Sequence, residues 1–157
     1  MTAKRIEAVL RPASVAVVGA SDTPGSIGEV LCRNLREGSF RGPVFYVNPR
    51  HASIGDKPSY PDVRSLPQAV DVAIIATPPP TLPTVLEHCG ERGVRGAIIV
   101  SAGFREGGEE GAACERTMLQ VARRYGLRLL GPNSFGVIRT DNGFNASCGA
   151  ALPKPGR

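Results

Sequence analysis

Five short apolar runs, each closed by glycine, proline or a small polar residue, constrain the fold of this chain more than any other feature. They occupy residues 14–19, 44–47, 70–76, 96–101 and 127–130. The run Val15-Ala16-Val17-Val18 is typical, because it is rich in β-branched residues and has no polar alternation. Strands have this composition when both faces of a parallel sheet are covered. The runs therefore predict a buried parallel sheet.

Helical patterns fill the gaps between these runs. Apolar residues recur at helical spacing in residues 27–35, 82–89 and 118–125, with a short leading helix expected over 2–10 and a helical turn over 65–69. Thr81 is the expected N-cap of the second helix, and Gly90 or Gly93 its stop; Gly38 and Gly126 end the other two. Alternating strands and helices predict an α/β fold, a Rossmann-like doubly wound parallel sheet of about five strands with helices on both faces.

The end of the chain has a different character. After Asn133 no clear pattern of strand or helix continues, and residues 152–157 are rich in proline and lysine or arginine. We therefore expect a single domain over residues 1–150. Residues 151–157 are expected to be a linker to downstream domains that are absent from this chain.

Composition limits the classes of partner that this chain can bind. No apolar run approaches the roughly 20 residues of a membrane helix, and the N-terminus lacks the apolar segment of a signal peptide. With 5% aromatic residues and no tryptophan, the chain has little for stacking nucleic-acid bases. The net charge of +5 comes mostly from arginine, which suits a small phosphorylated ligand. We expect a cytoplasmic protein with no membrane or nucleic-acid partner.

The four cysteines do not form a metal-binding pattern. They stand at positions 32, 89, 114 and 148, with no Cys-x-x-Cys pair and no histidine at ligand spacing. Reduced, partly buried thiols are the expectation, and no metal is expected.

Glycine-rich residues 19–28 are the most informative candidate site. The segment follows a predicted strand and opens a predicted helix, so its backbone N–H groups and the helix dipole would form a phosphate seat. Ser21 stands where the dinucleotide fingerprint has its second glycine, and Ile27-Gly28 follow Gly25-Ser26 where a Walker A loop requires lysine. The segment therefore matches neither familiar template, and a ligand-free strand-to-helix turn is the alternative.

The second strand end argues against an ordinary NAD site. Such sites carry Asp or Glu there to hold the ribose diol, whereas this chain has Val47-Asn48-Pro49 followed by Arg50 and His51. A ligand with an additional phosphate, such as NADP or coenzyme A (CoA), fits better. A solvated basic loop is the alternative.

The remaining strand ends offer little acid–base chemistry. Residues 77–80 contain no titratable group, and Ser101-Ala102-Gly103-Phe104 offers a hydroxyl and accessible backbone. His88 is expected to be exposed on the polar side of its helix, and no Gly-x-Ser-x-Gly elbow or carboxylate pair is present. No catalytic residue is assigned, and the chain is predicted to bind a ligand rather than to transform it.

Several stretches together resemble one family. They are Leu10–Ser21, Arg33–Leu35, Phe40–Val44, Val47–Pro49, Ser101–Phe104, Leu130–Gly136 (with its Leu-Gly-Pro-Asn-Ser motif) and Gly143–Ser147. In this order they resemble the CoA-binding domain of the succinyl-CoA synthetase α-subunit superfamily. The resemblance is greatest to the N-terminal domain of NDP-forming acyl-CoA synthetases and of synthetase-like protein lysine acetyltransferases.

The resemblance implies a set of CoA-binding positions. Gly19, Ser21, Pro24, Gly25, Ser26 and Ile27 match the phosphate and pantetheine contacts, while Val47, Asn48 and Pro49 match the adenine and ribose end, with Arg50 on a phosphate. Ala76, Thr77 and Pro78 match the wall beside pantetheine, Val100, Ser101 and Ala102 a main-chain contact, and Asn133 and Ser134 the thioester end.

The resemblance also defines what is missing. The synthetases phosphorylate a histidine in a following domain and use ATP and ADP in an ATP-grasp domain, and neither domain fits in 157 residues. We therefore expect a module that binds CoA or acyl-CoA and has no activity alone. The alternatives are an NAD(P)-binding oxidoreductase domain and a sensor or assembly domain that has lost its ligand.

Overall fold

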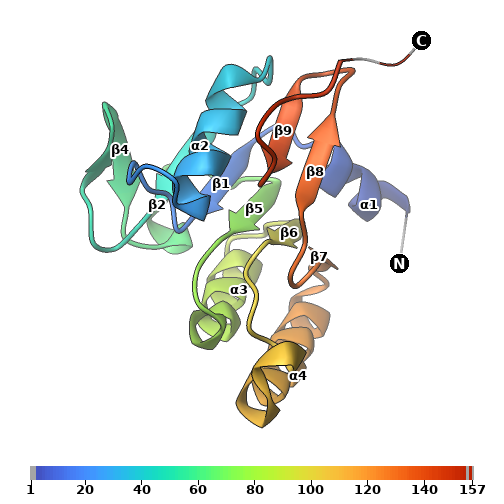
Figure 1. Cartoon of the computed structure of the whole chain (residues 1–157). Helices are drawn as coiled ribbons and strands as arrows, with labels where there is room; N and C mark the ends of the chain where they lie inside the picture. Colours follow the sequence, from blue (N-terminus) through green and yellow to red (C-terminus); the bar gives the residue numbers. More distant parts are fainter. Residues whose placement is uncertain (1–2, 155, 157) are drawn as a thin grey trace.

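A seven-stranded, mostly parallel sheet forms the centre of the protein. The computed structural model describes residues 3–154 and 156. The strand order is β3-β4-β2-β1-β5-β6-β7 (Figure 1). The strands are β1 (Val15–Val18), β2 (Val44–Val47), β3 (Ser53–Ile54), β4 (Lys57–Tyr60), β5 (Val72–Ile75), β6 (Gly96–Ile99) and β7 (Arg128–Leu130). All neighbouring strands are parallel except β3 and β4. The sheet contains all five predicted strands, and the doubly wound fold is confirmed.

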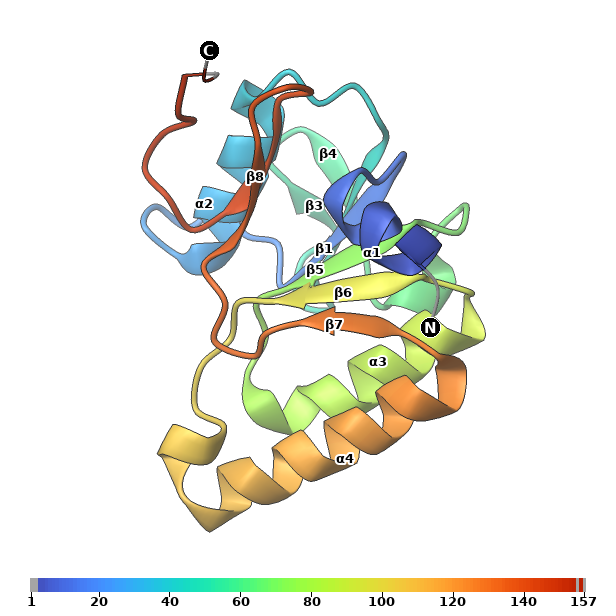
Figure 2. The ribbon, with the colours of Figure 1, turned by 90° about the vertical axis from the view of Figure 1, so that its right-hand side faces the viewer.

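Helices cover both faces of this sheet. They are α1 (Ala3–Leu10), α2 (Ile27–Glu37), α3 (Leu82–Glu91) and α4 (Glu109–Tyr125), with 3₁₀ turns η1 (Val63–Ser65), η2 (Pro79–Thr81) and η3 (Arg105–Gly107). Figure 2 shows α3 and α4 on one face and α1, α2 and a β-hairpin on the other. Two apolar cores result, one on each face.

The strands supply both cores because alternate residues point to opposite faces. On β1, Val15 and Val17 pack with Leu31 of α2, whereas Ala16 and Val18 pack in the cluster that contains Leu82 of α3. All four β1 residues are buried. This two-sided burial explains why the strand sequences lack polar alternation.

The prediction of an irregular segment after Asn133 was wrong. This part of the chain forms a hairpin of β8 (Gly136–Arg139) and β9 (Phe144–Ser147), which packs beside α2. The buried strand β9 contains Asn145 and Ser147, whose side chains hydrogen-bond each other at 2.6 Å. Polar residues that satisfy each other inside the core hide the apolar pattern of a strand.

Smaller differences between the predicted and the observed elements have local causes. The turn predicted over 65–69 begins earlier, at Val63, because the Asp62 carboxylate accepts a hydrogen bond from the Ser65 N–H at 2.9 Å. Strands β3 and β4 were not predicted, since they are short and largely exposed. Thr81 precedes α3, but its side chain makes no capping hydrogen bond. In the predicted linker, Leu152–Lys154 form no helix or strand, and positions 155 and 157 lie outside the described residues.

Candidate functional site

The carboxyl ends of the central strands meet at one edge of the sheet, as predicted. The N–H groups of Gly19 and Ala20 donate to the Val47 carbonyl oxygen at 2.9 and 3.3 Å, and the Ala76 N–H donates to Val18 at 2.9 Å. The Val100 N–H donates to Ile75 at 3.0 Å. These bonds place the predicted loops after β1, β2, β5 and β6 side by side. Ligands bind at this edge in open α/β sheets.

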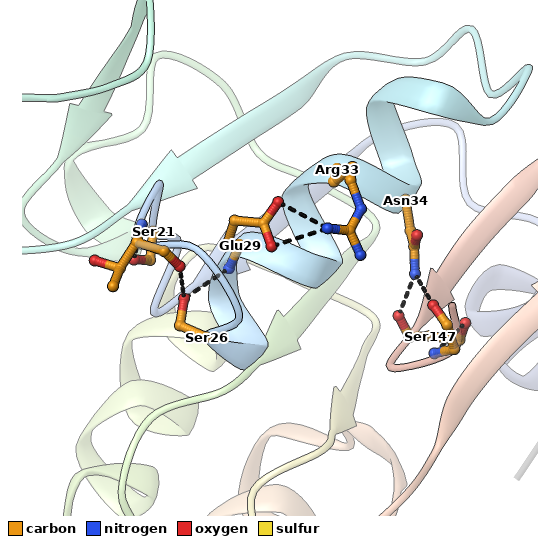
Figure 3. A network of polar contacts seen from close by, with 8 residues as sticks. Ser21, Ser26, Glu29, Arg33, Asn34 and Ser147 are labelled. Carbon is orange, nitrogen blue, oxygen red and sulfur yellow. Dashed lines mark hydrogen bonds and ion pairs between the residues drawn. The ribbon is translucent and has the colours of Figure 1, made fainter. Parts of the chain in front are cut away.

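The loop after β1 is built around the two serines that the sequence singled out. Ser21 Oγ accepts from the Thr23 N–H at 3.0 Å, and the Ser26 hydroxyl donates to the Thr23 carbonyl oxygen at 2.9 Å. Ser26 Oγ also accepts from the Glu29 N–H at 3.2 Å, so Ser26 is the N-cap of α2 (Figure 3). The loop is therefore shaped by its own hydrogen bonds.

Open backbone remains at the tip of this loop. Gly25 has φ +79°, and a Cβ there would have no atom within 4 Å. Within the described chain, the N–H groups of Ile27 and Gly28 in the first turn of α2 have no hydrogen-bond partner. Ile27, predicted on the apolar face of the helix, is 49% exposed instead and lies at the edge of the loop. Free N–H groups at a helix N-terminus favour an anion.

Gly28 brings the helix close to the strand. A Cβ at this position would collide with the carbonyl oxygen of Gly19, at the end of β1. Only glycine permits this close approach. The helix N-terminus thus stands directly over the strand end.

The carboxylate and thiol groups around the loop are either engaged by other groups or neutral, so the start of α2 can accept an anion. Glu29 is held by Arg33, with both carboxylate oxygens 3.1 Å from the guanidinium (Figure 3). Burial raises the pKa of the Cys32 thiol to about 11, although a hydrogen bond from the Ser21 N–H acts to lower that pKa. The thiol beneath the loop is therefore neutral near pH 7. Asp22 accepts from the Gly55 N–H at 3.2 Å, which ties the loop to the β3–β4 turn.

The loop after β2 is tied to the loop after β1. Asn48 Nδ2 donates to the Ala20 carbonyl oxygen at 2.8 Å, and Asn48 Oδ1 accepts from the Arg50 N–H at 2.9 Å. The Asn48 side chain is thus engaged by the backbone, and Pro49 and Arg50 are exposed. Among the described residues, the Arg50 guanidinium has no ion-pair partner. It is free to meet a phosphate.

The last two loops present mainly backbone. The Ser101 hydroxyl is buried and lies 3.4 Å from the Ile75 carbonyl oxygen, so Ser101 offers no free hydroxyl. The Ser101 carbonyl oxygen accepts from the Asn133 N–H at 2.9 Å, and Ser134 N–H donates to Ile99 at 3.1 Å. Asn133 has φ +52°, and its side chain is exposed. These contacts place Asn133 and Ser134 beside the loop after β6.

A slot of about 410 Å³ opens beneath the loops after β2 and β5. Its walls and floor are Val18, Val47, Pro49, Pro61, Asp62, Val63, Thr77, Pro80, Thr81, Thr84, Val85 and His88. Three of the predicted residues, Val47, Pro49 and Thr77, lie at this slot. Its volume is that of a small-molecule site.

The slot includes residues that the sequence analysis did not assign. His88 was expected to be exposed, but it is half-buried and lines the slot. Thr81, Thr84, Val85 and His88 have the i, i+3, i+4, i+7 spacing of one helix face, which was the available signal. Asp62 could not be assigned in the same way, because its place depends on the unpredicted strand β4.

Two kinds of feature are absent from the residues that the structure describes. Over residues 3–154 and 156, no group of three or more His, Cys, Asp or Glu side chains is arranged to hold a metal ion. Within the same residues, no helix has the length and apolar character needed to cross a membrane.

Comparison with known families gives this arrangement a context. Residues 13–140, most of the chain, match the family described as CoA binding domain. The chain belongs to this family. The resemblance inferred from the strand-end motifs is thereby confirmed.

Relatives of this CoA-binding domain are parts of longer proteins. The chain is 43% identical over 152 residues to acetate–CoA ligase (ADP-forming) I of Archaeoglobus fulgidus, covering 97% of this chain and 22% of the ligase. It is also 43% identical to the alpha subunit of acetate–CoA ligase (ADP-forming) I of Pyrococcus furiosus, covering 96% of this chain and 34% of that subunit. The chain therefore spans about a fifth to a third of the length of these relatives.

A solved structure shows the same fold. The dinucleotide forming acetyl-coenzyme A synthetase 1 of Ca. Korarchaeum cryptofilum, in complex with phosphate and ADP, aligns with a TM-score of 0.85 and 38% identity. The alignment covers 92% of this chain and 31% of the synthetase chain. The CoA-binding domain described here is homologous to part of such synthetases.

Proposed function

We propose that this chain binds CoA, or acyl-CoA, across the carboxyl edge of the sheet. One observation carries the proposal: the open glycine loop at the start of α2 and the apolar slot lie on the same edge, joined by the loops after β1 and β2. CoA has both chemistries, since phosphates and a flat base are linked within one molecule. The residues present therefore fit this ligand.

The eighteen predicted residues form groups that would contact successive parts of CoA. The loop from Gly19 to Ile27 would hold the diphosphate through backbone N–H groups, with the α2 dipole adding to the attraction. Arg50 would meet a further phosphate, and the base would enter the slot past Val47 and Pro49.

The other end of the ligand would lie over the later loops. Ala76–Pro78 and Val100–Ala102 would line the pantetheine arm, and Asn133 and Ser134 would lie near its end. CoA supplies a thiol that carries an acyl group as a thioester. The backbone groups at these loops would hold that arm in place.

We further propose that residues 1–150 are the CoA-binding unit of an ADP-forming acyl-CoA ligase, followed by a linker at 151–157. The names of the relatives support a ligase in preference to a lysine acetyltransferase. ATP and ADP would be used by downstream domains absent from this chain. The four cysteines are free thiols, which favours a cytoplasmic setting.

Calorimetric titration of the purified chain tests the proposal. We expect saturable binding of CoA at one site and weaker or no binding of NADPH. A preference for NADPH would favour the oxidoreductase alternative, which the family match does not support. Absence of binding to either ligand would contradict CoA binding by this chain.

A further inference from the structure

The inner part of the slot is polar on an otherwise apolar surface. Thr84 and His88 of α3 face Asp62, which precedes η1, across the slot. Helix α3 starts at the carboxyl edge and runs back along the sheet, so His88 lies about 10 Å further in than Thr81. A ligand group that reaches His88 must therefore fill the slot.

Most polar groups around the slot are already engaged. The Thr81 hydroxyl lies 2.7 Å from both the Thr77 hydroxyl and the Pro78 carbonyl oxygen, so it donates to the carbonyl and accepts from Thr77. Asp62 Oδ1 accepts from the N–H and the hydroxyl of Ser65, at 2.9 and 3.0 Å. These groups hold the shape of the slot.

The His88 imidazole is different. Its ring nitrogens form no hydrogen bond with any residue that the structure describes, although the side chain is half-buried among valines and prolines. Among the described residues, His88 is not one of those with a fully buried, unpartnered polar atom, so its unpaired ring nitrogens remain accessible from the slot. A ligand with hydrogen-bonding groups on a flat ring would supply a partner for them.

The charge near His88 is set by Asp62. Burial acts to raise the pKa of Asp62, but hydrogen bonds from Ser65 and the nearby Arg64 and His88 lower it below its ordinary value. The carboxylate is therefore ionised near neutral pH. Asp62 thus offers an acceptor opposite the imidazole.

We propose that His88 is a specificity-determining residue for the base of CoA. Its imidazole hydrogen-bonds the edge of the adenine ring, which presents ring-nitrogen acceptors and an exocyclic amino donor within the plane. This inference rests on the proposed binding of CoA. It goes beyond that proposal by assigning selection of the base to a helix residue outside the strand-end loops.

Titration of three ligands tests the role of His88. His88→Ala should weaken CoA and dephospho-CoA equally, by about tenfold, which corresponds to one lost hydrogen bond. Binding of 4′-phosphopantetheine, which has no base, should be unchanged. His88→Gln, which keeps a hydrogen-bonding group on a side chain of similar length, should restore most of the affinity. Gln120→Ala, exposed on α4, is the matched control.

Each other outcome overturns the inference in a distinct way. Weakening of CoA alone would assign His88 to the 3′-phosphate, and equal weakening of all three ligands would indicate a purely structural role. Unfolding measurements on each variant separate loss of fold from loss of contact, and His88→Gln serves if His88→Ala does not fold. Unchanged binding by His88→Ala would overturn the inference alone. Absence of CoA binding by the parent chain would overturn the proposed function as well.

Discussion

The side-chain amide of Asn34 on α2 donates to the carbonyl oxygen of Ser147 at 2.8 Å, which ties the helix to the end of β9 (Figure 3). The same Nδ2 group donates to the Gly149 carbonyl oxygen, also at 2.8 Å. Asn34 is buried, and the hairpin it holds follows directly from the loop of Asn133 and Ser134. This contact therefore connects the hairpin to the helix that opens at the proposed phosphate seat.

Replacing the donor should loosen this connection. Asn34→Asp keeps the shape but leaves two carbonyl oxygens facing an acceptor, so we expect the free energy of unfolding to fall by about 2–4 kcal/mol. Chemical denaturation measures the change. Glu37→Gln, an exposed change on the same helix, should have little effect. Equal stabilities of Asn34→Asp and the parent would contradict the structural role of this amide.

Gly28→Ala should disturb the phosphate seat through the backbone. The added methyl group meets the Gly19 carbonyl oxygen, so we expect a loss of stability of about 1–3 kcal/mol or more and at least tenfold weaker CoA binding. Gly93→Ala is the control, since Gly93 lies in open space away from the loop; it has a positive φ (+71°), which Gly28 does not have. It should lose about 1–2 kcal/mol and bind CoA as the parent does. Full stability of Gly28→Ala would show that α2 does not need this close approach.

Charge at the start of α2 can be separated from capping. Ser26→Asp keeps a good N-cap, so we expect nearly parental stability, but it places a carboxylate where the phosphates would bind. CoA affinity should fall by about tenfold or more. Ser26→Ala removes the cap and should cost about 1 kcal/mol of stability. Its loss of CoA affinity should be smaller than that of Ser26→Asp. Parental CoA binding by Ser26→Asp would contradict the loop assignment.

Arg50 should distinguish CoA from dephospho-CoA. Because its exposed guanidinium has no protein partner in the described structure, Arg50→Ala should weaken CoA by about three- to tenfold and affect dephospho-CoA less. Arg41→Ala, an exposed arginine before β2 at the opposite edge, should change neither. Equal losses for the two ligands would rule out contact with the 3′-phosphate.

The hairpin turn carries an acid-sensitive ion cluster. Hydrogen bonds from Arg139, assisted by the charge of Arg11, lower the pKa of Asp141 from 3.8 to about 2. Because folding favours the ionised carboxylate, its contribution is complete above the ordinary pKa and is lost as pH falls through the folded value. Asp141→Asn should therefore lower the unfolding temperature near pH 6, and the difference should shrink between about pH 4 and pH 2. A difference that stays constant over this range would contradict the ion-pair account.

The part of the fold visible in the sequence is the part built from local patterns. The run Val15–Val18 predicts β1, and the apolar spacing over residues 27–35 predicts α2, because both signals lie within a few residues. Strand β9 was missed since Asn145 and Ser147 are polar residues that are nevertheless buried, with their side chains hydrogen-bonded to each other.

The candidate site, like the fold, could be predicted only where the signal is local in the sequence. The strand-end loops follow from position in the chain, and the structure brings them together at one edge. The slot was not predicted, because Asp62 and His88 come together only after β4 and α3 pack. Ser101 shows the reverse case, since its hydroxyl is engaged by Ile75 and leaves only backbone for a ligand.

Backbone amide NMR of the isotope-labelled chain, titrated with CoA, tests the central claim most directly. We predict that the largest shift changes fall on residues 19–28, 47–50, 76–78, 100–102 and 133–134 and on α3 around Thr84 and His88. Shift changes confined to the opposite edge, around Ser39–Arg41 and Asp141, or none at saturating CoA, would contradict binding across the carboxyl edge of the sheet.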